Sequence, residues 1–169
     1  MNYSGIKYSD MINGPGIRVS LFVSGCSHAC PGCFNKETWN PKYGERFTEK
    51  QKEEIFDYFG KYPMLLRGLS LLGGDPTYKT NVGPLKDFIS EFRKQFPGKD
   101  VWMWTGYTWE EILENPSLLS LVKLCDVLVE GRFREEEKDL SLQWRGSRNQ
   151  RVIDIVSSLK EKAIILFSE

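Results

Sequence analysis

Residues 17–33 read IRVSLFVSGCSHACPGC, an alternating run followed directly by three closely spaced cysteines. The rest of the fold can be worked out from this segment. Over residues 17–23 every second side chain is aliphatic, which is the period-two pattern of a half-buried strand. The loop that follows has the spacing C-x3-C-x2-C and contains both glycine and proline. The sequence therefore predicts a strand over 17–23 that delivers Cys26, Cys30 and Cys33 at its carboxyl end.

The rest of the chain alternates between strand-like and helix-like segments. Thr48 with Gln51, and Thr108 with Glu111, have the capping-box spacing that begins a helix, and Pro84 is expected to open another. We expect strands at residues 17–23, 69–72, 101–104, 126–130, 152–156 and 163–167, and helices beginning near residues 49, 84, 109 and 117. This order predicts an α/β fold built from βαβ units around a mostly parallel sheet.

Active sites of such sheets lie at the carboxyl ends of the strands. The segments expected there are the cysteine loop, Gly73–Pro76, Thr105–Tyr107 and Gly131–Arg132, so we expect them to meet on one rim. Trp102 and Trp104 are interpreted as strand residues of the core. Thr105 and Tyr107 either line the pocket or flank it, and Asp126 and Glu130 are either pocket carboxylates or solvated charges.

Composition narrows the function classes. The 169 residues are expected to form one domain, 1–169, in which 23 basic residues balance 23 acidic ones. This balance removes the global electrostatic argument for binding nucleic acid or an anionic membrane surface. The first residues do not resemble a signal peptide, and no apolar run approaches the roughly 20 residues of a membrane-spanning helix. We therefore expect a cytoplasmic protein with reduced thiols and with no nucleic-acid or membrane partner.

Three loop thiolates this close together can face one soft metal centre. Three ligands suit a four-iron cluster that leaves one iron free to bind a substrate. Two other interpretations stay open: a structural zinc completed by His28 or Cys125, and a set of unmetallated thiols. By position, His28 is expected to shield the centre rather than bind it, and Cys125 is expected to be a buried core thiol.

Several motifs together resemble those of a known family. The cysteine spacing is similar to that of the radical S-adenosylmethionine (SAM) superfamily, and residues 13–18, NGPGIR, resemble the segment before the cluster in glycyl-radical-enzyme activases. The ordered set of 25–35, 72–76, 104–108, 126–131 and 145–151 most resembles the activating proteins of anaerobic ribonucleoside-triphosphate reductases. The likeness runs from about residue 5 to residue 155 and implies a partial β/α barrel of radical SAM type, open and shortened.

The resemblance also implies residue roles. Cys26, Cys30 and Cys33 would hold a [4Fe-4S] cluster whose fourth iron chelates the amino and carboxylate groups of SAM. The remaining SAM contacts would come from Gly73, Gly74 and Asp75 near the SAM ammonium, and from the backbone of Gly32, Cys33 and Phe34 near the adenine. Gly32 departs from the wider superfamily, where an aromatic residue often stands before the third cysteine. Adenine stacking is therefore left to another side chain, such as Phe34 or an aromatic residue near Trp104.

The activity implied by the resemblance is reductive cleavage of SAM to a 5′-deoxyadenosyl radical, which generates a glycyl radical on the large anaerobic (class III) reductase. Reduced flavodoxin is the implied electron donor. Alternatives are an activase of another glycyl-radical enzyme, a small-molecule radical SAM enzyme, a zinc-stabilised binding module and a plain iron–sulfur electron carrier. The arginine-rich stretch at 131–151 is either a solvated loop or a surface that engages the reductase, with Arg145 and Arg148 as its test positions.

Overall fold

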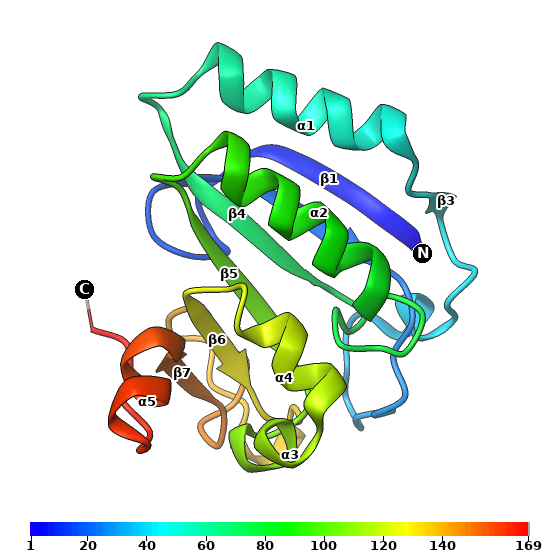
Figure 1. Cartoon of the computed structure of the whole chain (residues 1–169). Helices are drawn as coiled ribbons and strands as arrows, with labels where there is room; N and C mark the ends of the chain where they lie inside the picture. Colours follow the sequence, from blue (N-terminus) through cyan, green and yellow to red (C-terminus); the bar gives the residue numbers. More distant parts are fainter. Residues whose placement is uncertain (169) are drawn as a thin grey trace.

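A seven-stranded open sheet forms the centre of the protein in a computed structural model that describes residues 1–168 (Figure 1). The strand order is β3-β1-β2-β4-β5-β6-β7. The strands are β1 Asn2–Asp10, β2 Ile17–Val23, β3 Glu45–Arg46, β4 Leu66–Gly73, β5 Asp100–Thr105, β6 Val127–Glu130 and β7 Arg151–Asp154. The helices are α1 Glu49–Lys61, α2 Val82–Gln95, α3 Trp109–Glu114, α4 Pro116–Val122 and α5 Ile155–Glu161, with short 3-10 turns at Lys36–Trp39 and Glu135–Glu137.

The four central strands β2, β4, β5 and β6 run parallel, whereas β1 and β3 on one side and β7 on the other are antiparallel. Each parallel connection between β2 and β6 passes through helix-containing chain, as βαβ units require. The expected α/β fold with a mostly parallel sheet is confirmed. The sheet is open, because β3 and β7 stand at its two edges and do not pair with each other.

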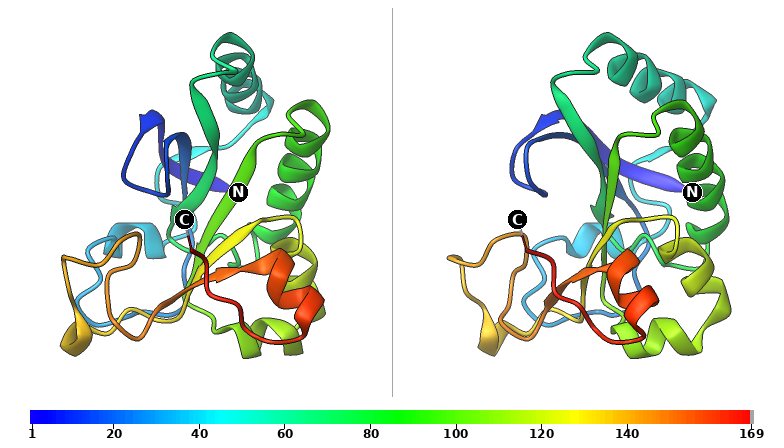
Figure 2. Two further views of the ribbon diagram at one scale, coloured as in Figure 1. Left: turned by 90° about the vertical axis from the view of Figure 1, so that its left-hand side faces the viewer. Right: turned by 60° about the vertical axis from the view of Figure 1, so that its left-hand side comes forward.

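The two faces of the sheet are covered differently. Helices α1 and α2 pack on one face, where their apolar residues join those of the strands in the main core (Figures 1 and 2). On the other face a smaller aromatic cluster surrounds the fully buried Trp102 and includes Trp104, Trp144 and Phe167. The chain that follows β6 crosses this second face, and it lies beside the segment that follows β2 (Figure 2).

The predicted helix starts are confirmed where a capping motif in the sequence marks them. Capping boxes form at Thr48 with Gln51 and at Thr108 with Glu111. Asn115 separates α3 from α4 because its side chain accepts hydrogen bonds from the first backbone N–H groups of α4. Helix α2 begins at Val82, two residues before Pro84. Proline is tolerated there because N–H groups in a first helical turn have no intrahelical partner.

Four parts of the sheet differ from the sequence prediction. Strands β1 and β3 were not predicted; β1 pairs antiparallel with the cysteine-bearing strand β2, and β3 is the edge strand beyond β1. The prediction of a strand at 163–167 is wrong. Leu166 makes one isolated bridge to Ile153, and the segment forms no continuous strand. The strand predicted at 152–156 ends at Asp154, whose side chain caps α5 by accepting from the Ser157 N–H.

Among the helices of residues 1–168, none combines the length and the apolar character that crossing a bilayer requires.

Candidate functional site

The loops that follow the four parallel strands line one cavity of about 460 Å³. The wall contains the three loop thiols and parts of the segments after β4, β5 and β6. The contributing residues are Cys26, Cys30 and Cys33; Gly73, Gly74 and Asp75; Thr105 and Gly106; and Phe133. The predicted meeting of the strand ends on one rim is therefore confirmed, and the cavity lies where parallel sheets place their active sites.

The three loop cysteines are free thiols and partly buried. Burial raises the pKa of the Cys26 thiol to about 11, and the charge of Asp75 adds to this effect. Burial also raises the pKa of Cys30, although the Phe133 N–H and the charge of Arg132 oppose it. Because thiolates are the binding form, loading a metal centre here would release protons. Three soft donors facing one cavity fit an iron–sulfur cluster.

The alternative of a structural zinc gains no support from the geometry. Within residues 1–168, no group of three or more His, Cys, Asp and Glu side chains, the three loop cysteines included, is arranged to hold a single metal ion, so neither His28 nor Cys125 completes a zinc site with them. The His28 imidazole is directed to Asp75, at 2.7 Å. Cys125 lies in the main core, 2% exposed, just before the amino end of β6, which confirms its prediction as a buried thiol. Burial raises its pKa.

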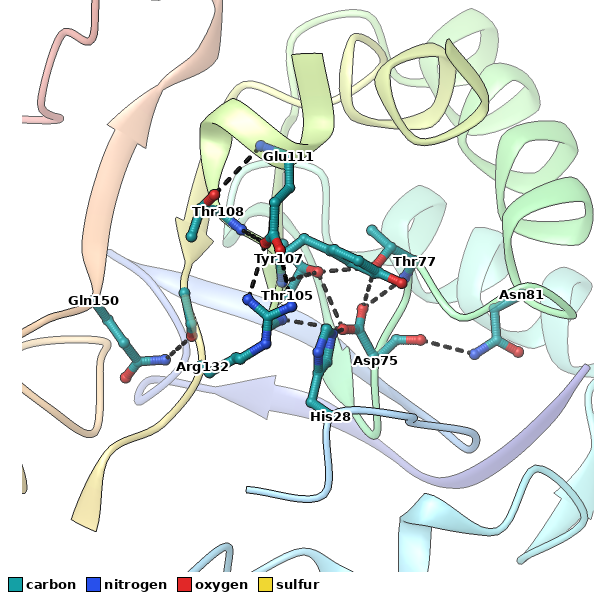
Figure 3. Close-up of polar contacts among 12 residues, drawn as sticks. His28, Asp75, Thr77, Asn81, Thr105, Tyr107, Thr108, Glu111, Arg132 and Gln150 are labelled. Carbon is teal, nitrogen blue, oxygen red and sulfur yellow. Dashed lines mark hydrogen bonds and ion pairs between the residues drawn. The ribbon is translucent and has the colours of Figure 1, made fainter. Parts of the chain in front are cut away.

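Asp75 is the most heavily hydrogen-bonded side chain of the site (Figure 3). Its Oδ1 accepts from the N–H and the hydroxyl of Thr77, at 2.8 and 2.6 Å. Its Oδ2 accepts from the Thr105 hydroxyl at 3.1 Å and from the Gly106 N–H at 3.0 Å, in addition to His28. With 1% exposure, the carboxylate therefore joins the ends of β4 and β5 to the cysteine loop.

The turn at Gly73 and Gly74 is pressed against the start of the cysteine loop. The Gly74 N–H donates to the Val23 carbonyl at 2.7 Å, and the Asp75 N–H donates to the Gly25 carbonyl at 2.8 Å. A Cβ at Gly74 would lie 2.7 Å from the Gly25 oxygen, and one at Gly73 would lie 2.6 Å from the Val23 oxygen. Gly73 also has φ +110°, which favours glycine. Only glycine fits both positions.

The other predicted contact residues occupy different places. Cys33 lines the cavity, and so does Phe34, although its side chain is 89% exposed. Gly32 lies beside the carboxylate of Glu135 instead of in the cavity wall. Thr105 lines the cavity, whereas Tyr107 stands behind it with its ring packed edge-on against His28.

The two carboxylates considered for the pocket are structural. Glu130 is 1% exposed, pairs with Arg151 and accepts from the Trp109 N–H at 3.1 Å, so it holds α3 and β7 together. Asp126 pairs with Arg93 at 2.6 Å and accepts from the Val101 N–H. Neither residue lines the cavity.

Sequence reasoning missed the outer wall of the cavity. Ile12 and Asn13 contribute from the loop after β1, and the stretch after β6 contributes Leu140, Leu142, Trp144 and Gln150. Asn13 lies inside the NGPGIR motif, which was the available signal for the first group. The second group belongs to the stretch 131–151, which the sequence places at the rim, but its lack of periodicity does not show which of its side chains face the cavity.

Arg18 explains how the NGPGIR motif is held. Its side chain is fully buried and pairs with Asp100 at 2.5 Å, and its Nε donates to the Ser70 hydroxyl at 2.7 Å. It also donates to the carbonyls of Leu69 and Pro15, and its guanidinium lies over the Trp102 ring. The Ser70 hydroxyl in turn donates to the Asn13 carbonyl at 2.6 Å. Arg18 and Ser70 thus fix the loop that contains Asn13 and Pro15, at the mouth of the cavity, to strand β4.

Comparison with known proteins agrees with these features. A sequence profile described as a 4Fe-4S single cluster domain matches residues 12–153. An anaerobic ribonucleoside-triphosphate reductase-activating protein of Escherichia coli (strain K12) is 44% identical over 150 residues, covering 89% of this chain and 96% of the relative. Proteins of the same name from Vibrio cholerae serotype O1 and Enterobacteria phage T4 are each 42% identical, over 89% and 90% of this chain and 96% and 93% of their own lengths. The chain therefore belongs to the family of anaerobic ribonucleoside-triphosphate reductase-activating proteins and carries a 4Fe-4S single-cluster domain.

Proposed function

We propose that this protein is a radical SAM enzyme that generates the glycyl radical on an anaerobic (class III) ribonucleoside-triphosphate reductase. The observation that carries the proposal is the convergence of three cysteine thiols and a Gly73–Asp75 turn on one cavity at the carboxyl ends of parallel strands. Membership of the activating-protein family supports the identity of the partner. The open sheet is proposed to be a shortened form of the radical SAM β/α barrel.

Cys26, Cys30 and Cys33 are the residues proposed to hold a [4Fe-4S] cluster. Three protein ligands leave one iron available to the amino and carboxylate groups of SAM. A bound, reduced cluster would supply the one electron that breaks the C5′–S bond of SAM, giving methionine and a 5′-deoxyadenosyl radical. Hydrogen transfer from a reductase glycine to that radical would give 5′-deoxyadenosine and a glycyl radical.

The chain contributes binding, orientation and exclusion of water. Gly73 and Gly74 keep the backbone close to the cysteine loop, and the negative charge of Asp75 favours an ammonium group on this side of the cavity. The backbone of Cys33 and Phe34 is proposed to meet the adenine, and Gly32 is proposed to shape the turn before them from its place beside Glu135, outside the cavity wall. Trp104 and Trp144, joined by a 2.7 Å hydrogen bond from the Trp104 indole N–H to the Trp144 carbonyl, form an apolar wall available for stacking.

The partner is a protein, which agrees with a cavity that has an exposed rim. Phe34, Leu140 and Ile12 line the cavity and are 89%, 89% and 71% exposed. A reductase loop carrying the target glycine can approach from this side. We propose reduced flavodoxin as the electron donor and the cytoplasm as the compartment, since the thiols must stay reduced to bind the cluster.

The direct test is a complete activation assay. The anaerobically reconstituted protein is mixed with the reductase, SAM and reduced flavodoxin, and both 5′-deoxyadenosine and the glycyl-radical electron paramagnetic resonance (EPR) signal are measured. We expect both products from the wild type and from Cys125→Ala, which removes a core thiol outside the cavity. We expect neither product from Cys30→Ala.

Other outcomes would identify other functions. 5′-Deoxyadenosine without a glycyl radical on the reductase would indicate a different radical SAM substrate. A cluster that never consumes SAM would indicate an electron carrier, and one zinc per chain without iron would indicate a zinc-stabilised module. Each of these three results would overturn the proposed function.

A further inference from the structure

The middle of the cysteine loop reaches the sheet through one side chain. The Gly25 and Cys26 N–H groups are held by the carbonyls of Thr38 and Trp39, and the Cys33 N–H donates within the loop to Cys30. Between them, His28 extends to Asp75 at the end of β4. Ala29 has φ +49°, a left-handed conformation that costs free energy in a residue with a Cβ. The surrounding structure must therefore hold this loop in place.

The place occupied by His28 is shaped for its ring. The imidazole is 5% exposed, and its Nε2 lies 2.7 Å from the Asp75 Oδ2. One side meets the Tyr107 ring edge-on, with 4.6 Å between ring centroids. Gly106 also lies against the ring, because an added Cβ there would come within 2.3 Å of the His28 Cδ2. Gly106 thus leaves room for the imidazole.

The acceptor for His28 is fixed by groups outside the cysteine loop. Thr77 supplies two donors to the Asp75 Oδ1, and Thr105 and Gly106 supply two donors to its Oδ2. These donors come from the turn after β4 and from the end of β5. The carboxylate therefore keeps its orientation whether or not the cysteine loop is in contact, so it is preorganised for the imidazole.

We propose that His28 and Asp75 are positioning residues that hold the cysteine loop in the conformation that binds the cluster. Gly106 provides the space that the His28 ring occupies. Neither side chain is a cluster ligand in this arrangement. The proposal rests on the cysteine loop being the cluster site, and it is independent of what the cluster later does to SAM. Partners that orient ligands from outside the coordination sphere commonly change metal affinity by about 10–100-fold when they are lost.

The test compares His28→Ala and Gly106→Ala with the wild type. The first removes the anchor, and the second displaces it without changing the loop sequence. His28→Gln keeps a donor at similar reach, and Gly60→Ala is the matched glycine control, because nothing lies within 4 Å of a Cβ at Gly60. The readouts are the rate of cluster loss to a ferrous-iron chelator and amide hydrogen exchange of residues 26–33 in the metal-free chain.

Both disruptive variants are expected to lose the cluster roughly tenfold faster than the wild type and to exchange faster over residues 26–33. His28→Gln should recover most of the retention, and Gly60→Ala should match the wild type. Loss at the wild-type rate by His28→Ala and Gly106→Ala would overturn the proposal. So would metal-free variants that melt far below the wild type, since the pair would then hold the fold rather than the loop. A wild type without iron is recognised first by metal content and contradicts the cluster site itself.

Discussion

At the scale of single residues, the buried guanidinium of Arg18 is the clearest case of one side chain holding several segments. Its own side chain has no solvent exposure, and it binds the partly exposed Asp100 carboxylate, the Ser70 hydroxyl and two backbone carbonyls. Burial lowers its pKa, and Asp100 opposes that effect. The loop at the cavity mouth depends on this network through Pro15 and Asn13.

Replacing Arg18 with methionine should lower the free energy of unfolding by about 3 kcal/mol, because the partners of a buried charge are left without a donor. The matched control is Arg67→Met, which removes a half-exposed arginine that pairs with the same Asp100 at 3.3 Å. That control should cost less than about 1 kcal/mol. Denaturant unfolding of the metal-free chains measures both values, and equal losses would contradict the assignment.

At this scale the sequence indicates residue types better than contacts. The cysteine spacing and the Gly73–Asp75 turn both stand out in the sequence, and both line the cavity. The partners of Asp75 could not be predicted, because Thr105 and Gly106 lie 30 and 31 positions away along the chain. The sequence could not show whether Glu130 is a pocket carboxylate, because its buried ion pair joins it to Arg151, which is distant along the chain.

At the scale of secondary-structure elements, local signals predicted what local interactions determine. The two capping boxes formed as expected, and the break at Asn115 produced two short helices in place of one. Strand β1 escaped prediction because it is half-exposed and contains Gly5 and Lys7, with little alternation. The apolar run at 163–167 was wrongly predicted to be a strand, because it pairs with β7 through one bridge at Leu166 and not through a continuous ladder.

The break between α3 and α4 gives a test at this scale. Asn115→Ala should lower the free energy of unfolding by about 1 kcal/mol, because the Ser117 and Leu118 N–H groups lose their acceptor. Asn115→Asp should stay close to the wild type, since aspartate caps a helix equally well. Chemical denaturation of the three chains decides the matter. An alanine variant as stable as the wild type would show that the cap adds nothing.

At the scale of the whole molecule, the parallel order of β2, β4, β5 and β6 brings the site together. Strand alternation in the sequence sufficed to predict that four loops would share a rim, because parallel strands end on the same side. The same argument placed the start of the long segment after β6 at this rim, but not the course of the rest. Apolar residues of the segment form the outer wall of the cavity, and Arg148, which is 61% exposed, lies where a protein partner can reach it.

The structure refines the test of that surface. The Arg145 guanidinium donates to the Gln150 carbonyl at 2.6 Å, so its loss would disturb the segment itself. Arg148 is 61% exposed and lies 3.7 Å from Asp139, which makes it the cleaner position. Arg148→Glu should weaken binding to the reductase by roughly tenfold at low salt, with a smaller effect at high salt.

Lys50→Glu on α1 is the control for charge reversal, because Lys50 is 76% exposed and no residue of α1 lines the cavity. It should bind the reductase as the wild type does. Affinities from titration calorimetry at two salt concentrations measure the difference. Equal affinity of the Arg148→Glu variant and the wild type would exclude this part of the segment from the interface.

Three cysteines are proposed to hold a cluster with one iron open to SAM. This is tested most simply by EPR of the anaerobically reconstituted, dithionite-reduced protein, recorded with and without SAM. The wild type is expected to give a reduced [4Fe-4S] signal that changes shape when SAM is added, and Cys30→Ala is expected to give no such signal. A signal that SAM leaves unchanged, or a protein that binds zinc and forms no cluster, would contradict this proposal.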